Sequence, residues 1–183
     1  MGLFGNLGKA TFAGRDPFFP KTFEGLVEIM AVAFYESKDP GKDGIWFLRI
    51  TGRLLTAHYP GGKLPEDGLL PGQTAVHLLK LGTEAQIKKA QTPAMGDLKA
   101  FCTAGFRQIA IDTDADPDDV TPDDFGDAEA ELVYGPEQAF MGKRLGLKTS
   151  LKKTKEDNDF TQHYWCDGKA FHSALPEVKG EAA

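Results

Sequence analysis

The chain has 183 residues, of which 41% are hydrophobic and 10% aromatic, and a formal net charge of -6. This length supports one well-cored domain and is short for two. Two cysteines, Cys102 and Cys166, exclude a disulfide scaffold and show no CxxC spacing, which favours a reducing compartment. The first residues, MGLFGNLGKATFAGRDPFF, lack the apolar run of a signal peptide or a membrane span, so we expect a soluble, cytoplasmic protein with no membrane partner.

Short strand-like patterns dominate the first half of the chain. Residues 26–37 (LVEIMAVAFYES) are rich in β-compatible residues, and residues 44–55 (GIWFLRITGRLL) alternate between apolar and polar. The turn sequence DPGKDG between them predicts a hairpin. A Gly- and Pro-rich loop at 58–73 then precedes a third predicted strand at 74–82.

Helix signals follow in the second half. Residues 97–106 (DLKAFCTAGF) predict a helix with Asp97 as N-cap. Residues 121–134 predict a second helix, with Thr121 as N-cap and Pro122 at the first helical position. The segments 143–155 and 159–168 predict a final hairpin around the turn EDN.

Five strands with a helix between the third and the fourth are the element order of an OB-type barrel. Three stretches together resemble the layout of phage-encoded single-stranded DNA-binding proteins of the OB fold: VEIMAVAFYESKDPGKDGIWFLRITGRLL, GDLKAFCTAGF and GKRLGLKTSLKKTKEDNDFTQHYW. The resemblance implies a mainly β fold, an OB-like five-stranded barrel with one or two helices between strands three and four. It also implies a protein that binds single-stranded DNA in phage replication or recombination.

The resemblance covers residues 25–168 and sets the expected domain organisation. We expect an N-terminal arm at 1–24, a nucleic-acid-binding domain at 25–168 with an acidic insertion at 112–131, and a C-terminal tail at 169–183. Members of the family often end in an acidic, aromatic-tipped tail. Here the end, LPEVKGEAA, is only mildly acidic, and the acids lie inside the chain.

Charge is strongly segregated along the sequence. Residues 112–131 hold eight Asp and two Glu and no Lys or Arg, so without them the net charge of -6 becomes +4. Residues 143–155 hold six basic residues and no acid. This asymmetry predicts a polyanionic partner.

Period-two alternation assigns faces to two strands. In the second strand the apolar face holds Trp46, Leu48, Ile50 and Leu54, and the other face holds Phe47, Arg49, Thr51 and Arg53. In the fourth strand the apolar face holds Leu145, Leu147, Thr149 and Leu151, and the other face holds Arg144, Lys148, Ser150 and Lys152, with Lys153 at the turn.

These aromatic and basic faces predict a groove for a single strand, which needs cations along the phosphates and flat rings under the bases. The predicted phosphate-binding residues are Arg49, Arg53, Arg144, Lys148, Lys152 and Lys153. Bases would stack on Phe47 and on Tyr164 or Trp165 of the last strand. The alternative is that the lysines only block edge pairing and keep the hairpin soluble.

Other chemistry is weakly supported by the sequence. GKRLGLKT lacks the phosphate-loop spacing, DTDADPDD has Pro117 where a calcium loop needs Gly, and His163, Cys166 and His172 do not have zinc-site spacing. No catalytic arrangement of Ser, His, Cys or Asp stands out. We therefore expect no enzyme, no cofactor and no metal.

The sequence is compatible with two functions. The first is a sequence-tolerant, non-catalytic single-stranded DNA-binding protein. The second is a structural or assembly protein, such as a β-barrel virion component, whose basic strand contacts an acidic partner. The acidic segment 112–131 is either a solvated loop and helix start or a surface that competes for the basic groove or recruits replication or recombination proteins. The sequence leaves open whether the chain forms a homo-oligomer.

Overall fold

The fold is mainly β, with one five-stranded antiparallel sheet in the order β3-β2-β1-β4-β5. The computed structural model describes residues 16–89, 92–121, 125–154 and 156–174. The strands are β1 (Phe23–Glu36), β2 (Trp46–Leu54), β3 (Thr74–Gly82), β4 (Arg144–Lys153) and β5 (Asp159–Asp167). The helices are α1 (Glu84–Lys88), α2 (Pro93–Asp112), α3 (Asp127–Tyr134) and α4 (Gly168–Ala174), with short 3₁₀ turns η2 (Pro60–Gly62) and η3 (Pro117–Asp119).

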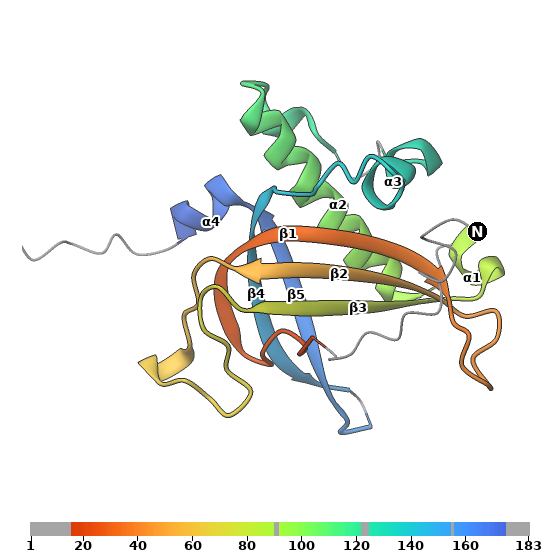
Figure 1. The fold of residues 1–183 in the computed structure, drawn as a ribbon, viewed down its shortest axis with the longest axis horizontal. Coiled ribbons are helices and arrows are strands. Elements are labelled where there is room, and N and C mark those ends of the chain that lie inside the picture. The colour runs from red at the N-terminus through yellow and green to blue at the C-terminus, as the bar shows by residue number, and fades with distance from the viewer. Residues whose placement is uncertain (1–15, 90–91, 122–124, 155, 175–183) are drawn as a thin grey trace, which may run out of the picture.

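The long strand β1 belongs to both halves of the sheet. Its first part pairs with β4 and its second part with β2, and the pairing with β2 shifts register between Ile29 and Ala31. Such a bulge bends a strand and increases its twist. The β4–β5 hairpin therefore crosses behind β1, β2 and β3 at a steep angle (Figure 1). The core lies between these two layers, with Leu48 and Ile50 from one and Leu147 and Trp165 from the other.

Backbone hydrogen bonds do not close the sheet between β3 and β5 in the described ranges, where both are edge strands. The closed barrel expected from the sequence is therefore not confirmed. At the β3 edge the segment that leads into β1 forms a short parallel bridge, in which Val76 bonds to Pro17 and Phe19. We call the region between the edges of β3 and β5 the seam.

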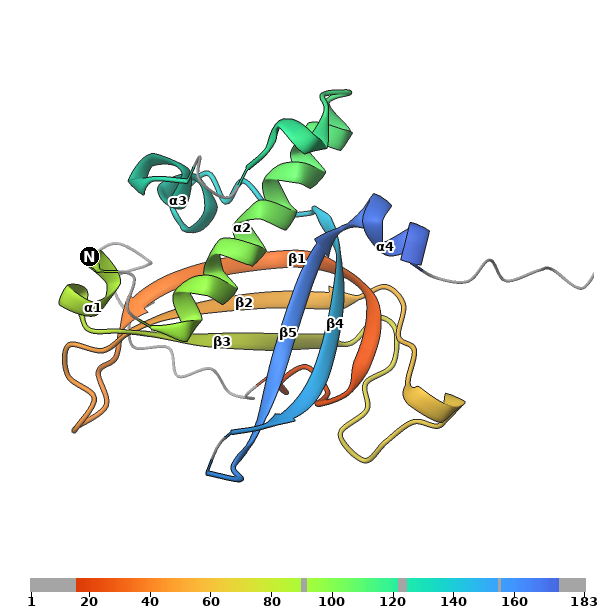
Figure 2. The ribbon, with the colours of Figure 1, turned by 180° about the vertical axis from the view of Figure 1, so that it is seen from behind.

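The helix between strands three and four is present but begins earlier than predicted. Helix α2 has Thr92 as N-cap and Pro93 in its first turn, so Asp97 lies inside the helix and is not its cap. The buried side chains of Phe101, Cys102 and Ala104 pack on the core. Figure 2 shows α2 lying across the sheet beside β5.

The second predicted helix begins later than expected. Helix α3 starts at Asp127 behind Gly126, whose N–H donates to the Glu129 carboxylate, so Thr121 is not a helix cap. Pro122 lies outside the described residues. Several acidic residues before Gly126 belong to the separate 3₁₀ turn η3. Asp116 is the N-cap of this turn, and its carboxylate accepts a hydrogen bond from the N–H of Asp118.

Residues on both sides of the predicted domain contribute to packing. In the described part of the predicted arm, Phe19 and Phe23 are buried in the core, and in α4 Phe171 is buried. None of the helices in the described ranges is long and apolar enough to cross a membrane.

Candidate nucleic-acid interface

The structure confirms which residues of β2 face the core and which face outward. Leu48, Ile50 and Leu54 are fully buried, and Trp46 is half-buried against Phe34, with ring centroids 4.6 Å apart. Phe47, Arg49 and Arg53 point to the opposite, outer face, as the period of two requires.

The two arginines on this outer face are already paired with carboxylates. Arg49 Nη2 lies 2.7 Å from Asp16 Oδ2, and Arg53 donates through Nε and Nη2 to Glu28 Oε2, the Nε bond being 3.0 Å. Glu28 stands directly opposite Arg53 on β1. A phosphate would have to compete with these acids, so Arg49 and Arg53 are weaker phosphate-binding candidates than the sequence predicts.

Phe47 lies in an aromatic and basic cluster on the outer face. Its ring stacks on Tyr35 of β1, with centroids 6.0 Å apart and an angle of 21° between the planes. On the other side Phe47 is paired in register with Lys80 of β3, which is exposed. The sequence pattern did not predict that Tyr35 and Lys80 contribute to this site. They lie beside Phe47 only because of the register in which the three strands pair.

The core face of β4 is shorter than predicted. Leu145 and Leu147 are fully buried, and buried Thr149 donates through Oγ1 to the Pro20 carbonyl at 2.7 Å. Leu151 is 44% exposed and does not belong to the core. The reason is that the end of the β4–β5 hairpin extends beyond the crossing with β1, as Figure 2 shows.

The two candidate stacking rings of β5, Tyr164 and Trp165, lie on opposite faces of the strand, so only one of them is exposed. Trp165 is only 7% exposed, and its Nε1–H donates to Nδ1 of His77 at 3.3 Å. It packs on Phe101 with centroids 5.1 Å apart. Of the two rings that the sequence offered as alternatives, Trp165 is buried and Tyr164 is 43% exposed on the outer face, so Tyr164 is the stronger candidate for base stacking.

A third exposed ring, Phe160, was not predicted from the sequence. It is 44% exposed, and the alternation that places Tyr164 on the outer face of β5 also places Phe160 there. The register of β4 and β5 sets Lys148 directly opposite Tyr164 and Lys152 directly opposite Phe160. With Phe47 and Lys80, these form what we call the three lysine–ring pairs.

The concentrated positive charge of residues 143–155 is partly neutralised by folding. Three of its bases are ion-paired with acids elsewhere in the sequence: Lys143 with Asp112 at 2.6 Å, Lys153 with Asp157 at 2.7 Å, and Lys148 with Glu24 at 3.9 Å. Within the described ranges Arg144 and Lys152 have no ion pair. Lys155 lies outside those ranges. Lys153 is thus the least available to a phosphate of the predicted ligands on this hairpin, because Asp157 already pairs with it. Lys152 is more available.

The predicted residues do not form a single groove on one face. The outer side of β1–β3 faces the viewer in Figure 1, and the outer side of the β4–β5 hairpin faces the viewer in Figure 2, from behind. The pair Phe47–Lys80 therefore lies on one side, and the pairs Lys148–Tyr164 and Lys152–Phe160 on the other. The two sides meet at the edges of β3 and β5, where the seam lies.

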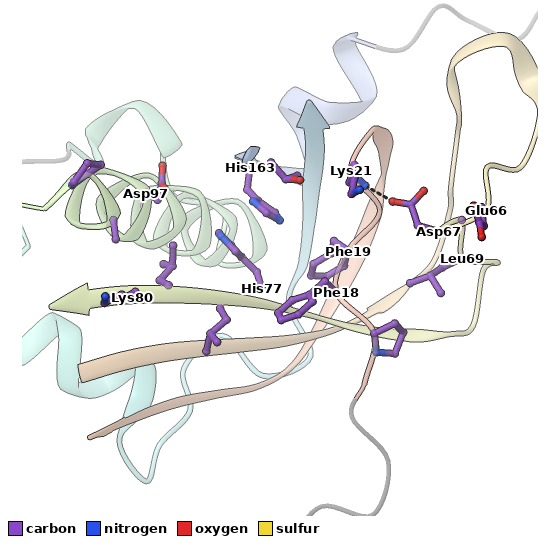
Figure 3. A pocket seen from close by; sticks show the side chains of 17 residues that line it. Phe18, Phe19, Lys21, Glu66, Asp67, Leu69, His77, Lys80, Asp97 and His163 are labelled. Atoms are coloured by element: carbon purple, nitrogen blue, oxygen red, sulfur yellow. Dashed lines mark hydrogen bonds between the residues drawn. The ribbon is translucent and has the colours of Figure 1, made fainter. Parts of the chain in front are cut away.

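A groove of about 840 Å³ follows the seam (Figure 3). Its walls come from β3, β5, the start of α2, residues 17–21 and the loop around Asp67 and Leu69. His77 and His163 approach one another across the seam and stack with centroids 3.6 Å apart and 13° between their planes.

Both imidazoles are held in the neutral form. Burial lowers the pKa of His77 to about 2, helped by the neighbouring His163, and burial lowers the pKa of His163 to about 4. Because Trp165 donates to Nδ1 of His77, the proton of the neutral His77 ring is on Nε2.

The potential metal-ligating side chains of the described ranges do not gather at one place. In those ranges, no group of three or more His, Cys, Asp or Glu side chains is placed to hold a metal ion. Burial raises the pKa of the Cys166 thiol to about 11 and that of Cys102 to about 12, which keeps both thiols protonated.

The described residues of the acidic segment 112–131 lie at the opposite end of β4 and β5 from the end of the β4–β5 hairpin (Figure 2). The segment is tied there by the Asp112–Lys143 pair and by Arg107, which lies 4.0 Å from Asp118. Its described residues do not cover Lys148 or Lys152. The hypothesis that this segment competes for the basic face is therefore not supported within one chain.

The chain matches no protein-family model, and it matches no curated protein. The resemblance to phage single-stranded DNA-binding proteins thus stays a prediction, which depends on the residues described above.

Proposed function

We propose that the protein is a non-catalytic, sequence-tolerant single-stranded DNA-binding protein. The observation that carries this proposal is the set of three lysine–ring pairs, each formed by residues that the strand register places directly opposite one another. A flat ring stacks on any base, for about 1–3 kcal/mol per base, while the adjacent ammonium group reaches the phosphate. This combination favours single strands, because paired bases cannot offer their faces.

We further propose that the fold is an OB-like barrel that is open between β3 and β5. The support is the central position of β1 between β2 and β4 and the location of α2 between β3 and β4. OB folds bind single strands on the face of their second and third strands and with the loop between the last two. Phe47 and Lys80 lie on the first of these places, and Lys152 and Phe160 lie near the second.

The biological setting that fits this activity is phage DNA replication or recombination in the host cytoplasm, with the acidic segment 112–131 as a surface for other proteins of that process. Both follow from the family resemblance and the charge pattern. Neither is needed for the binding test.

The test is fluorescence anisotropy of a labelled oligo(dT) with the wild-type protein and with one double variant for each of the two lysine–ring pairs on the β4–β5 hairpin. We expect Lys148→Gln/Tyr164→Ser and Lys152→Gln/Phe160→Ser each to weaken binding about tenfold, with little change in melting temperature. Lys63→Gln/Lys89→Gln, which removes two exposed loop charges, is the control and should bind like wild type. Absence of oligo(dT) binding at low salt would overturn the proposal.

Parallel titrations with duplex DNA, single-stranded RNA and polyglutamate distinguish the alternatives. Tighter binding to polyglutamate than to any nucleic acid would favour the assembly protein with an acidic partner. Equal binding to duplex and single strands would mean that the rings do not contact bases.

A further inference from the structure

The groove at the seam has the size and shape of a small-ligand site. Its volume of about 840 Å³ lies within the range of about 300–1,000 Å³ that such sites occupy. The groove lies where the two outer faces meet. On the β3 side it is lined by Lys80, the partner of Phe47 in one lysine–ring pair. On the β5 side it is lined by Thr161, which is next to Phe160 in the sequence.

Two phenyl rings and two imidazoles, those of Phe18, Phe19, His77 and His163, line the groove. Phe18 is 65% exposed, although its backbone is held by the bridge to Val76. Phe19 is buried behind it and packs edge-on against His163 and Trp165. A phenyl ring that is fixed in position and open on one side offers a flat surface to another ring.

Among the polar side chains that line the groove, His77, His163 and Asp97 are buried or half-buried, whereas Lys21, Glu66, Asp67 and Lys80 are exposed. Nδ1 of His77 accepts the Trp165 bond, which leaves Nε2–H as a donor in a side chain that lines the groove. Asp97 lines the groove from α2, and burial raises the pKa of its carboxyl group. The groove thus combines hydrogen-bonding groups of both kinds with ring surfaces.

This chemistry selects among ligand classes. The buried part of the groove offers an anion no charged imidazole, because both histidines resist protonation, so a phosphate would bind at the exposed Lys21 or Lys80. An aliphatic chain would offer no hydrogen bond to Nε2–H of His77 or to the Asp97 carboxyl group. A flat, uncharged heterocycle with donors and acceptors on its edge satisfies both the rings and the polar groups.

We propose that the groove binds one nucleobase, stacked on Phe18 and hydrogen-bonded by Nε2–H of His77. The inference rests on the proposed single-strand binding when the base belongs to a bound strand, which Lys80 would hold at the edge of the groove. A free nucleoside offers the same base chemistry.

The indole N–H of Trp165 reports on this site from inside the protein, because it donates to His77 directly behind the groove. The indole of Trp46 is the internal control, since it packs on Phe34 and does not line the groove. In a ¹H–¹⁵N spectrum, saturating oligo(dA) should shift the Trp165 indole resonance and leave that of Trp46 in place. Adenosine at millimolar concentration, in a second titration, should shift the same resonance.

Phe18→Ala removes the stacking surface and keeps the backbone bridge. It should weaken oligo(dA) binding by about fivefold or more and abolish the Trp165 shift, with a melting temperature close to wild type. Met141→Ala, which truncates a side chain that is 61% exposed outside the groove, is the matched control and should change neither.

The outcomes separate this inference from the proposed function. Oligonucleotide binding without a Trp165 shift, or unchanged by Phe18→Ala, overturns the base site and leaves the proposed function standing. A shift with adenosine but no oligonucleotide binding supports the base site and overturns the proposed function. No shift with either ligand overturns the base site.

Discussion

Lowering the pH from 7 to 5 should destabilise the protein through the stacked imidazoles of His77 and His163. In the folded state burial lowers the pKa of His163 to about 4 and that of His77 to about 2, against 6.5 for an unperturbed histidine. Between these values and 6.5 the unfolded chain binds more protons than the folded chain, so stability falls as the pH falls. Asp97 acts in the opposite direction, because burial raises its pKa.

The expected loss can be worked out for His163 alone. A difference of one unit between folded and unfolded pKa corresponds to about 1.4 kcal/mol, so a fall from 6.5 to about 4 gives a full loss of about 3 kcal/mol. About 2 kcal/mol of this is reached at pH 5, where only the unfolded chain is protonated. For a domain of this size 2 kcal/mol corresponds to a decrease of about 4–8 °C in melting temperature. His77 adds a loss of similar size at pH 5.

The assay is urea unfolding at pH 7 and pH 5 for the wild type and for His163→Gln. The relevant quantity is the difference in unfolding free energy between the two pH values, because the variant also changes stability at pH 7. We expect this difference to be about 2 kcal/mol smaller in His163→Gln than in the wild type. An unchanged difference in His163→Gln would refute the neutral, stacked arrangement.

Other predictions concern β5 and the two thiols. Tyr164→Ser should weaken oligo(dT) binding about fivefold with little change in melting temperature, while Trp165→Phe should destabilise the fold by about 1–3 kcal/mol in thermal unfolding, because it leaves His77 without its hydrogen bond. The reverse pattern would mean that the faces of β5 are inverted. Cys102 and Cys166 should react slowly with a thiol reagent at pH 8 in the native protein and quickly in guanidinium, since burial raises their pKa values to about 12 and about 11. Fast reaction in the native state would contradict their burial.

The strands were predictable because each signal is local. The third strand was predicted at 74–82 and is observed at Thr74–Gly82. The prediction of its end succeeded because the apolar pattern stops at Gly82, directly before Thr83, the N-cap of α1. Alternation also assigned Phe47 to the outer face of β2. It could not reveal that Tyr35 and Lys80 flank this ring, because neighbours across strands are set by register and not by sequence spacing.

The candidate site was less predictable, because it depends on contacts between distant segments. The sequence left Tyr164 and Trp165 as alternative stacking rings, and the fold separates them, because Trp165 lies inward, where His77 accepts its N–H. The six bases of 143–155 formed a run without acids in the sequence, but the fold brings Asp112 and Glu24 to them from other strands and helices. A run of basic residues in the sequence therefore overestimates the positive charge that the folded surface presents.

The salt dependence of oligo(dT) binding tests the central claim most directly. If the lysines of the three lysine–ring pairs each contact a phosphate, the slope of log affinity against log salt should be about -2, from about -0.7 per contact on a single strand. Lys148→Gln/Lys152→Gln should reduce the magnitude of that slope by about 1.4 at unchanged melting temperature, and Lys63→Gln/Lys89→Gln should not change it. A slope that is near zero in the wild type, or reduced equally by both double variants, would contradict a defined single-strand track on this protein.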